Sequence, residues 1–437
     1  MQSLEQGPVP PTELIIAPPK PLDARKSPIR GSKEHPDHRL EKAVQSLISL
    51  TRKHPLSFLV RMYSWSRKAN HRGSRRPIPL EKRGSDSKST HFPLPTSTLN
   101  APQRLYMPII FSMIMVLAGL LLWTPDLSFQ RLKAFYETPQ SQLIQTPESL
   151  IFAEDTNPST TDAPTLLLIH GLGSSLQTWD EWTRLLKPQL RIVRFDLPGF
   201  GLSSAPTSHD YSDAADLRRL EQFIEAKKLG SFMLGGHALG GRMAWLYAAK
   251  HPEKVSHLVL LSPEGFPSEP EKTLQTGVGF VPTHTYDTPF YVGLMRFALP
   301  KWAVRAVLES AYADPGLMTE QTLSRYHDML LAPGVRDSMH ERMQQSMSID
   351  PRATLGSIHV PTLILWGDQD RFIPKSNLGE YEREMPTAHA QVLENTGHLI
   401  QEENAEASVT SFLSFIGRLQ SSESGSNSGN KTSANPN

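Results

Sequence analysis

The stretch Leu234–Gly241, LGGHALGG, follows the apolar residues Phe232–Leu234 and precedes a helix-like run, Arg242–Ala249. This order predicts a buried strand, a sharp glycine turn and a helix, the context in which the pattern G-x-S-x-G exposes a serine nucleophile. The flanking glycines let the central residue occupy a strained turn without striking the neighbouring strand and helix. The central residue here is Ala238, whose methyl group cannot attack a substrate. The sequence therefore predicts a catalytic frame without its usual nucleophile.

Charge separates the chain into a basic arm and an acidic remainder. The 437 residues include 45 Lys and Arg and 44 Asp and Glu. Residues 1–104 hold 19 of the basic and 8 of the acidic residues, a net charge of +11, so the remainder holds 26 against 36, or −10. Such asymmetry indicates separate tasks for the two parts. The chain has no cysteine, which excludes disulfides, thiolate catalysis and Cys-based zinc sites, and we expect neither a metal nor a cofactor.

The N-terminal region contains too little apolar sequence to form a core. Residues 1–36 are rich in proline and charge, and we expect residues 1–104 to be largely disordered. Between Arg39 and Lys68 two interpretations stay open: an amphipathic helix on an anionic membrane surface, or transient helices in a solvated tail. A basic arm is also a feature of proteins that bind nucleic acid. No recognition motif accompanies it, so we expect no nucleic acid binding.

Residues 105–123 form a run of 19 residues without a charge, with Tyr106 and Trp123 near its ends. About 20 apolar residues cross a bilayer core, and aromatic residues favour its edges. Because the run is apolar all round, a transmembrane helix in the lipid bilayer is favoured over a buried core helix. Basic residues are concentrated before the run. The positive-inside rule therefore predicts a single-pass protein with a cytoplasmic N-terminus and the remaining chain on the periplasmic or extracytoplasmic side.

From about residue 137, short apolar runs alternate with helix-like segments. The runs are typical of strands buried on both faces of a parallel sheet, and they cover residues 149–153, 165–169, 191–195, 232–234, 255–261, 362–366 and 391–393. Helical patterns cover residues 214–228, 239–250 and 405–419. The alternation predicts an α/β fold with a doubly wound, mostly parallel sheet over residues 137–420. The Ser/Asn/Gly-rich tail, residues 421–437, is expected to be disordered.

An insertion of about residues 266–355 interrupts this alternation. It contains helical patterns of its own, including Trp302–Leu308 and Leu323–Leu330. We expect these helices to form a lid over the carboxyl ends of the strands, since lids exclude water and shape specificity.

Four further motifs follow predicted strands in the order required for a nucleophile, an acid and a base. They are HGLGSS at residues 170–175, DLPGFGLS at 196–203, WGDQDRFIP at 366–374 and NTGH at 395–398. Asp370 lies just past one predicted strand, and His398 lies past the last predicted strand. These two residues are therefore the candidate acid and base. Gly171 allows backbone N–H groups to face the reacting centre, so we expect Leu172 and Leu239 to supply an oxyanion hole.

Together the motifs resemble the α/β-hydrolase superfamily over residues 165–418, in particular its branch of esterases, meta-cleavage-product hydrolases and epoxide hydrolases. The resemblance implies that Asp370 orients His398 as the base, with Asp368 only a neighbour, and that a helical lid covers a small-molecule site. His170 is expected to buttress the oxyanion turn. The residues expected to border the substrate are His170, Gly171, Ser174 and His237.

The alanine leaves three interpretations open. In the first, His398 and Asp370 activate water, and the protein hydrolyses a small ester, amide or labile acid. The chain resembles the aminoacrylate hydrolase group in having alanine in this frame. In the second, the protein is an inactive pseudoenzyme that binds or scaffolds. In the third, a serine hydrolase carries a nucleophile substitution. The intact Asp, His and glycine frame favours hydrolysis.

Overall fold

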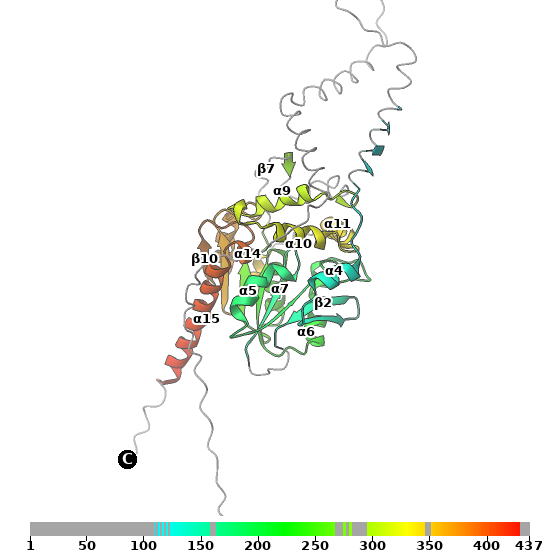
Figure 1. Cartoon of the computed structure of the whole chain (residues 1–437). Coiled ribbons are helices and arrows are strands. Elements are labelled where there is room, and N and C mark those ends of the chain that lie inside the picture. Colours follow the sequence, from blue (N-terminus) through cyan, green and yellow to red (C-terminus); the bar gives the residue numbers. More distant parts are fainter. Residues whose placement is uncertain are drawn as a thin grey trace, which may run out of the picture. The chain divides into compact units, whose positions relative to one another are not determined.

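The computed structural model describes residues 123–157, 163–266, 274–276, 279–281, 295–345 and 351–428, with a few single residues between 109 and 120 (Figure 1). The predicted basic region, residues 1–104, lies outside the described residues. The predicted span, residues 105–123, lies outside them except for those single residues and Trp123. Within the described part of the chain, no helix is both long and apolar enough to cross a bilayer.

Eight strands form one sheet in the order β1-β2-β4-β3-β5-β6-β9-β10. They are β1 (Ser141–Gln145), β2 (Leu150–Asp155), β3 (Thr165–Ile169), β4 (Arg191–Phe195), β5 (Phe232–His237), β6 (Val255–Leu261), β9 (Thr362–Gly367) and β10 (His389–Leu393). β2 pairs antiparallel with β1 and β4, and all other neighbours are parallel. The predicted mostly parallel α/β sheet is therefore confirmed. A short antiparallel pair, β7 (Leu274–Thr276) and β8 (Gly279–Val281), lies outside this sheet.

Helices cover both faces of the sheet, which explains why its central strands carry almost no polar residues. Along β3, Leu167 and Ile169 point into one hydrophobic cluster, while Leu166 and Leu168 point into the other. The first cluster includes side chains of α6 (Asp213–Ala226) and α7 (Leu239–Lys250). The second includes side chains of α5 (Asp180–Leu186) and α15 (Ala405–Ser428).

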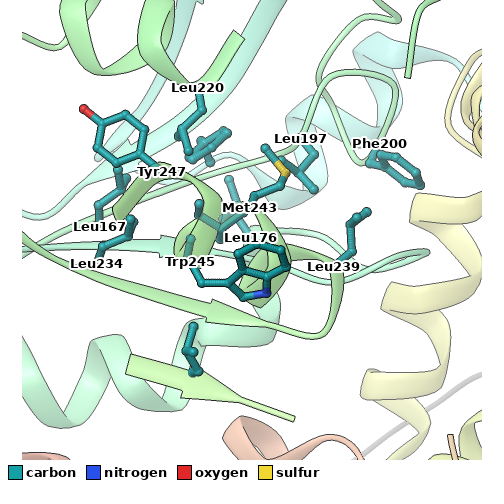
Figure 2. Close-up of a cluster of buried hydrophobic side chains, with 14 of the residues drawn as sticks. Leu167, Leu176, Leu197, Phe200, Leu220, Leu234, Leu239, Met243, Trp245 and Tyr247 are labelled. Carbon is teal, nitrogen blue, oxygen red and sulfur yellow. The ribbon is translucent and has the colours of Figure 1, made fainter. Parts of the chain in front are cut away.

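The strand and helix on either side of Ala238 are fixed by this packing. Figure 2 shows Leu234 of β5 in one cluster with Met243 and Trp245 of α7, and Leu239 at the start of that helix. Trp245 is fully buried and Met243 nearly so. Each such side chain stabilises the fold by about 1.5–3 kcal/mol through apolar burial. The turn between β5 and α7 is therefore held at both ends.

The predicted insertion between β6 and β9 contains α9 (Lys301–Ala311), η3 (Pro315–Leu317), α10 (Glu320–Leu330), α11 (Val335–Gln345) and α12 (Arg352–Leu355). Figure 1 shows α9, α10 and α11 grouped together at one end of the sheet; these three are called the insertion helices below. Side chains of α10 and α11 lie over the loop that follows β3. A Cβ on Gly173 would lie 3.8 Å from Met339 and 3.9 Å from Leu330.

The remaining helices are α4 (Phe129–Tyr136), η1 (Leu176–Trp179), α13 (Ser376–Glu384) and α14 (Ile400–Glu403). The last helix, α15, continues to Ser428 and so extends into the tail that we expected to be disordered from residue 421.

Candidate active site

The turn that carries Ala238 has the strained backbone of a nucleophile elbow. Ala238 has φ 49° and ψ −115° and is only 4% exposed. Its N–H donates to the carbonyl oxygen of Leu261 at 3.1 Å. A Cβ on Gly236 would lie 2.2 Å from the carbonyl oxygen of Gly240, and a Cβ on Gly240 would lie 2.2 Å from that of Ile169. Only glycine fits at these two positions, so the turn that the sequence predicted is present with alanine at its centre.

The two distant motifs that were expected to supply an acid and a base meet in space. Nδ1 of His398 lies 2.9 Å from Oδ2 of Asp370, whose side chain is fully buried. The His398 side chain is 12% exposed. The contact occupies Nδ1, so Nε2 is the ring nitrogen left to exchange a proton with a substrate or water.

The loop around Asp370 holds this pair in place. Oδ1 of Asp370 accepts hydrogen bonds from the N–H groups of Phe372 and Ile373 at 2.8 and 2.9 Å. The Phe372 ring stacks on the His398 ring with centroids 5.2 Å apart. The neighbouring carboxylate, Asp368, instead accepts from the N–H of Thr396 and so supports the histidine loop, in line with the neighbour role expected for it.

The predicted oxyanion loop lies against the elbow. A Cβ on Gly171 would lie 3.2 Å from Cβ of Ala238 and 2.9 Å from Nδ1 of His237, so the loop approaches as closely as glycine allows. Leu239 is the first residue of α7, where the N–H has no partner within the helix. Among the described residues, none accepts a hydrogen bond from the N–H of Leu172 or Leu239. Both donors are available to an oxyanion.

His170 joins the ends of two strands and is fully buried. Its Nε2 accepts from the N–H of Leu197 at 2.9 Å, and its Nδ1 lies 2.8 Å from the carbonyl oxygen of Gly171. An accepting Nε2 requires a proton on Nδ1, which then donates to Gly171. Burial lowers the pKa of His170 to about 4, so the ring is neutral near pH 7. These contacts connect the loop that carries Gly171 to the loop that follows β4.

The other two residues expected near the substrate lie beside the same loop. The ring of His237 lies 4.5 Å from that of His398, and its Nε2 lies 3.0 Å from the carbonyl oxygen of His398. Burial holds the pKa of His237 well below its usual 6.5. Oγ of Ser174 lies 3.4 Å from the hydroxyl of Tyr326 on α10, which links the oxyanion loop to the insertion helices.

Sequence reasoning missed two carboxylates near this site. Glu264 follows β6, and its N–H donates to the carbonyl oxygen of Ala238 at 3.0 Å. A polar residue just past a parallel strand was the available signal, but Glu264 lies between that strand and the predicted insertion and was assigned no role. Glu402, on the short helix after His398, accepts hydrogen bonds from the insertion helices. Nothing in its sequence context marks it out.

Glu402 is the centre of a polar cluster between the core and the insertion. It accepts hydrogen bonds from Tyr326 at 2.7 Å, Tyr312 at 3.2 Å and Thr178, and it forms an ion pair with Arg325 at 2.6 Å. The Arg325 and Glu402 side chains are only 13% and 10% exposed. A carboxylate with this many donors fixes the insertion helices against the core. Within the described residues, no group of three or more His, Asp or Glu side chains could hold a metal ion.

Comparison with known proteins agrees with this architecture. Residues 164–405, more than half of the chain, match the family described as the alpha/beta hydrolase fold. Monoacylglycerol lipase abhd6-B of Xenopus laevis is 26% identical over 277 residues, which cover 60% of this chain and 77% of that protein. Lipase 1 of Psychrobacter immobilis is 27% identical over 303 residues, which cover 67% of this chain and 88% of that protein.

Solved structures share the fold as well. A membrane phospholipase A, described as a novel bacterial virulence factor, is 24% identical with a TM-score of 0.56, over 72% of this chain and 99% of that one. A serine-to-alanine mutant of the meta-cleavage product hydrolase CumD from Pseudomonas fluorescens IP01, complexed with acetates, is 19% identical with a TM-score of 0.54, over 64% of this chain and 98% of that one. From its matched residues and its fold, this chain belongs to the α/β-hydrolase family of enzymes.

Proposed function

We propose that this α/β-hydrolase cleaves a small ester, amide or labile acid by activating water directly, without a covalent acyl-enzyme. The observation that carries the proposal is the Asp370–His398 pair, joined at 2.9 Å, beside an elbow whose central residue is Ala238. An acid–base pair with nothing to deprotonate on the protein is suited to deprotonate water.

In the proposed reaction, Nε2 of His398 takes a proton from water while the hydroxide forms a bond to the substrate carbonyl carbon. The carbonyl oxygen becomes an oxyanion, which accepts hydrogen bonds from the N–H groups of Leu172 and Leu239. When the intermediate collapses, the bond to the leaving group breaks and the imidazolium returns its proton to that group. Asp370 stabilises the imidazolium and sets the tautomer. The products are an acid and an alcohol or amine.

The absence of a serine limits the rate that this site can reach. An oxyanion hole and substrate binding alone still provide on the order of 10³–10⁴-fold over water when a triad is incomplete. We therefore expect an activated or labile substrate. The relatives named as lipases make acyl esters the first class to examine.

A binding protein without turnover is the alternative, because Ala238 also suits a site that holds a ligand intact. A serine hydrolase with a substituted nucleophile is a further alternative. Both predict that changing His398 leaves any residual hydrolysis unaltered. The short and well-supported contact between Asp370 and His398 favours hydrolysis over the binding protein, since a binding site has no need of an oriented base.

We also propose that residues 105–123 anchor the protein in a lipid bilayer, with the hydrolase part outside the cytoplasm and the insertion helices acting as a lid. Contacts just after the proposed span join its end to the insertion. The N–H of Leu127 donates to the carbonyl oxygen of Leu331 at 2.8 Å, and Asp126 pairs with Arg336 at 2.5 Å. A span that ends near residue 123 would hold the insertion close to the bilayer.

Exposed aromatic residues on the same part of the molecule are consistent with a membrane surface. Trp123 is 60% exposed, and its ring lies 6.4 Å from that of Phe297, which is 57% exposed. Trp302 on α9 is 50% exposed. Tryptophan and other aromatic side chains favour the bilayer interface.

The test is steady-state hydrolysis by the purified chain over a panel of activated esters, amides and labile acids. We expect turnover that falls by about 10²-fold or more in His398→Ala and also falls in Asp370→Asn. Equal rates in the parent and His398→Ala, with both proteins folded, would overturn the proposal in favour of its two alternatives.

A further inference from the structure

Glu264 lies next to the elbow but has no part in the water-activating chemistry. Its N–H donates to the carbonyl oxygen of Ala238 at 3.0 Å. Its own carbonyl oxygen accepts from Nε1 of Trp245 at 3.0 Å and from the hydroxyl of Tyr381 at 2.9 Å. Three hydrogen bonds thus fix its backbone at the carboxyl end of β6, beside the reacting centre.

The Glu264 carboxyl has no protein partner among the described residues, which neither donate a hydrogen bond to it nor form an ion pair with it. The two arginines whose charges act on it are engaged with other carboxylates. Arg242 donates to both oxygens of Asp213 at 2.9 and 2.6 Å. Arg342 donates to both oxygens of Asp216 at 2.6 and 2.9 Å. Glu264 is the carboxylate of this group that has no donor.

The surroundings of Glu264 disfavour the charged form of its carboxyl. Burial raises the pKa of its carboxyl, against the opposing charges of Arg242, Arg342 and His398. Solvent still reaches the carboxyl oxygens, and a ligand that displaces this water has to supply a hydrogen bond in its place. Glu264 keeps part of its surface accessible, which gives a ligand a route to it. The backbone bond to Ala238 places Glu264 beside the elbow, and the charge of His398 acts on its carboxyl.

We propose that Glu264 is the polar anchor of the substrate site, binding a hydroxyl, amide N–H or ammonium group that the substrate carries a few bonds from the carbonyl under attack. The inference rests on the proposed function, because it assigns a substrate class to the same site. A substrate with such a group supplies the hydrogen bond that the protein does not. A substrate that is apolar at that point leaves the carboxyl unpaired, so the site discriminates between the two.

Binding of a matched pair of ketones tests this without requiring turnover. 4-Hydroxypentan-2-one and 4-methylpentan-2-one have nearly the same shape and differ by a hydroxyl in place of a methyl group. Neither can be hydrolysed, and ligand-observed NMR measures both affinities. We expect the full chain to bind the hydroxy ketone about 10-fold or more tightly than its isostere, the difference that one buried hydrogen bond makes.

Three variants test whether the preference for the hydroxy ketone depends on the Glu264 side chain. Glu264→Leu should abolish or reverse it, while Glu264→Gln should keep much of it because an amide still donates and accepts. Glu406→Leu, at an exposed position of α15, should leave it unchanged. Equal affinities in the parent, no binding of either ketone, or a preference that survives in folded Glu264→Leu would overturn the inference. A preference that depends on Glu264 without hydrolysis in the ester panel would instead refute the proposed reaction and leave the anchor standing.

Discussion

Oδ2 of Asp370 lies 2.9 Å from Nδ1 of His398, while Oδ1 of the same carboxylate accepts two backbone hydrogen bonds. One side chain therefore fixes both its own loop and the orientation of the imidazole. This arrangement is useful when a base must be presented in one tautomer. Such a base ordinarily takes a proton from a serine hydroxyl. Here the methyl group of Ala238 stands in place of that hydroxyl, in a turn that keeps its strained backbone.

Stability should depend on the titration of His170 in acid. The pKa of about 4 in the folded protein lies below the ordinary 6.5, so between these values the unfolded chain binds more protons. The contribution of His170 to the free energy of unfolding therefore rises with pH from 4 to 6.5. Roughly 3 kcal/mol of it is lost as the pH falls through that window. His170→Asn should remove this component, as followed by urea unfolding at pH 4 to 7.

Other groups titrate in the same range. The quantity to compare is therefore the difference in the free energy of unfolding between the parent and His170→Asn at each pH. Burial raises the pKa of Asp196 to about 7, which gives a slope of the opposite sign that is common to both proteins. If the difference in the free energy of unfolding between the two proteins stays the same from pH 4 to 6.5, this result would contradict the neutral, buried state of His170.

Removing the Glu402 carboxylate should loosen the insertion helices. Glu402→Ala leaves the nearly buried guanidinium of Arg325 without its partner, and breaking such a pair costs about 3–5 kcal/mol. Hydrogen exchange should accelerate in α10 more than in the strands of the sheet. The exposed Glu406→Ala change is the control. Unaltered protection of α10 in Glu402→Ala would show that the cluster does not hold the insertion.

Substituting Glu264 should stabilise the protein while it alters binding. Leucine has a similar volume and removes a carboxyl whose charged form is disfavoured by partial burial, which raises its pKa. Glu264→Leu should therefore raise the melting temperature at pH 7, the trade-off expected at a functional position. A lower melting temperature would mean that the carboxyl makes a stabilising contact in the folded protein.

The predicted anchor can be tested by topology mapping. A reporter enzyme fused after Ser421 should be active only outside the cytoplasm, because the basic residues before 105–123 favour a cytoplasmic N-terminus. The full chain should also resist extraction from membranes by carbonate. Reporter activity in the cytoplasm would contradict the orientation, and release by carbonate would contradict the span.

Much of the fold could be predicted because the strands are buried on both faces. Apolar runs such as 165–169 and 255–261 coincide with β3 and β6. The edge strand β1 was missed, since its sequence, SQLIQ, is polar at both ends and half exposed. Its pairing with β2 comes from tertiary context, which overrides weak local preference.

The candidate site was predictable where glycine and strand order constrain it, and less so elsewhere. The sequence order of the motifs indicated that Asp370 and His398 would meet. The environment of Glu264 could not be inferred, because it depends on which partners Arg242 and Arg342 take from α6. The cluster around Glu402 likewise joins residues more than 70 positions apart, such as Arg325.

The central claim is that the elbow, the base and the acid keep a working geometry around Ala238, and restoring the hydroxyl tests it most directly. Ala238→Ser adds one oxygen at a position where alanine already fits. The variant should be labelled by a serine-reactive fluorophosphonate and should gain activity on activated esters by about 10²-fold or more, with both effects lost on adding His398→Ala. A correctly folded Ala238→Ser protein that stays unlabelled would contradict the account.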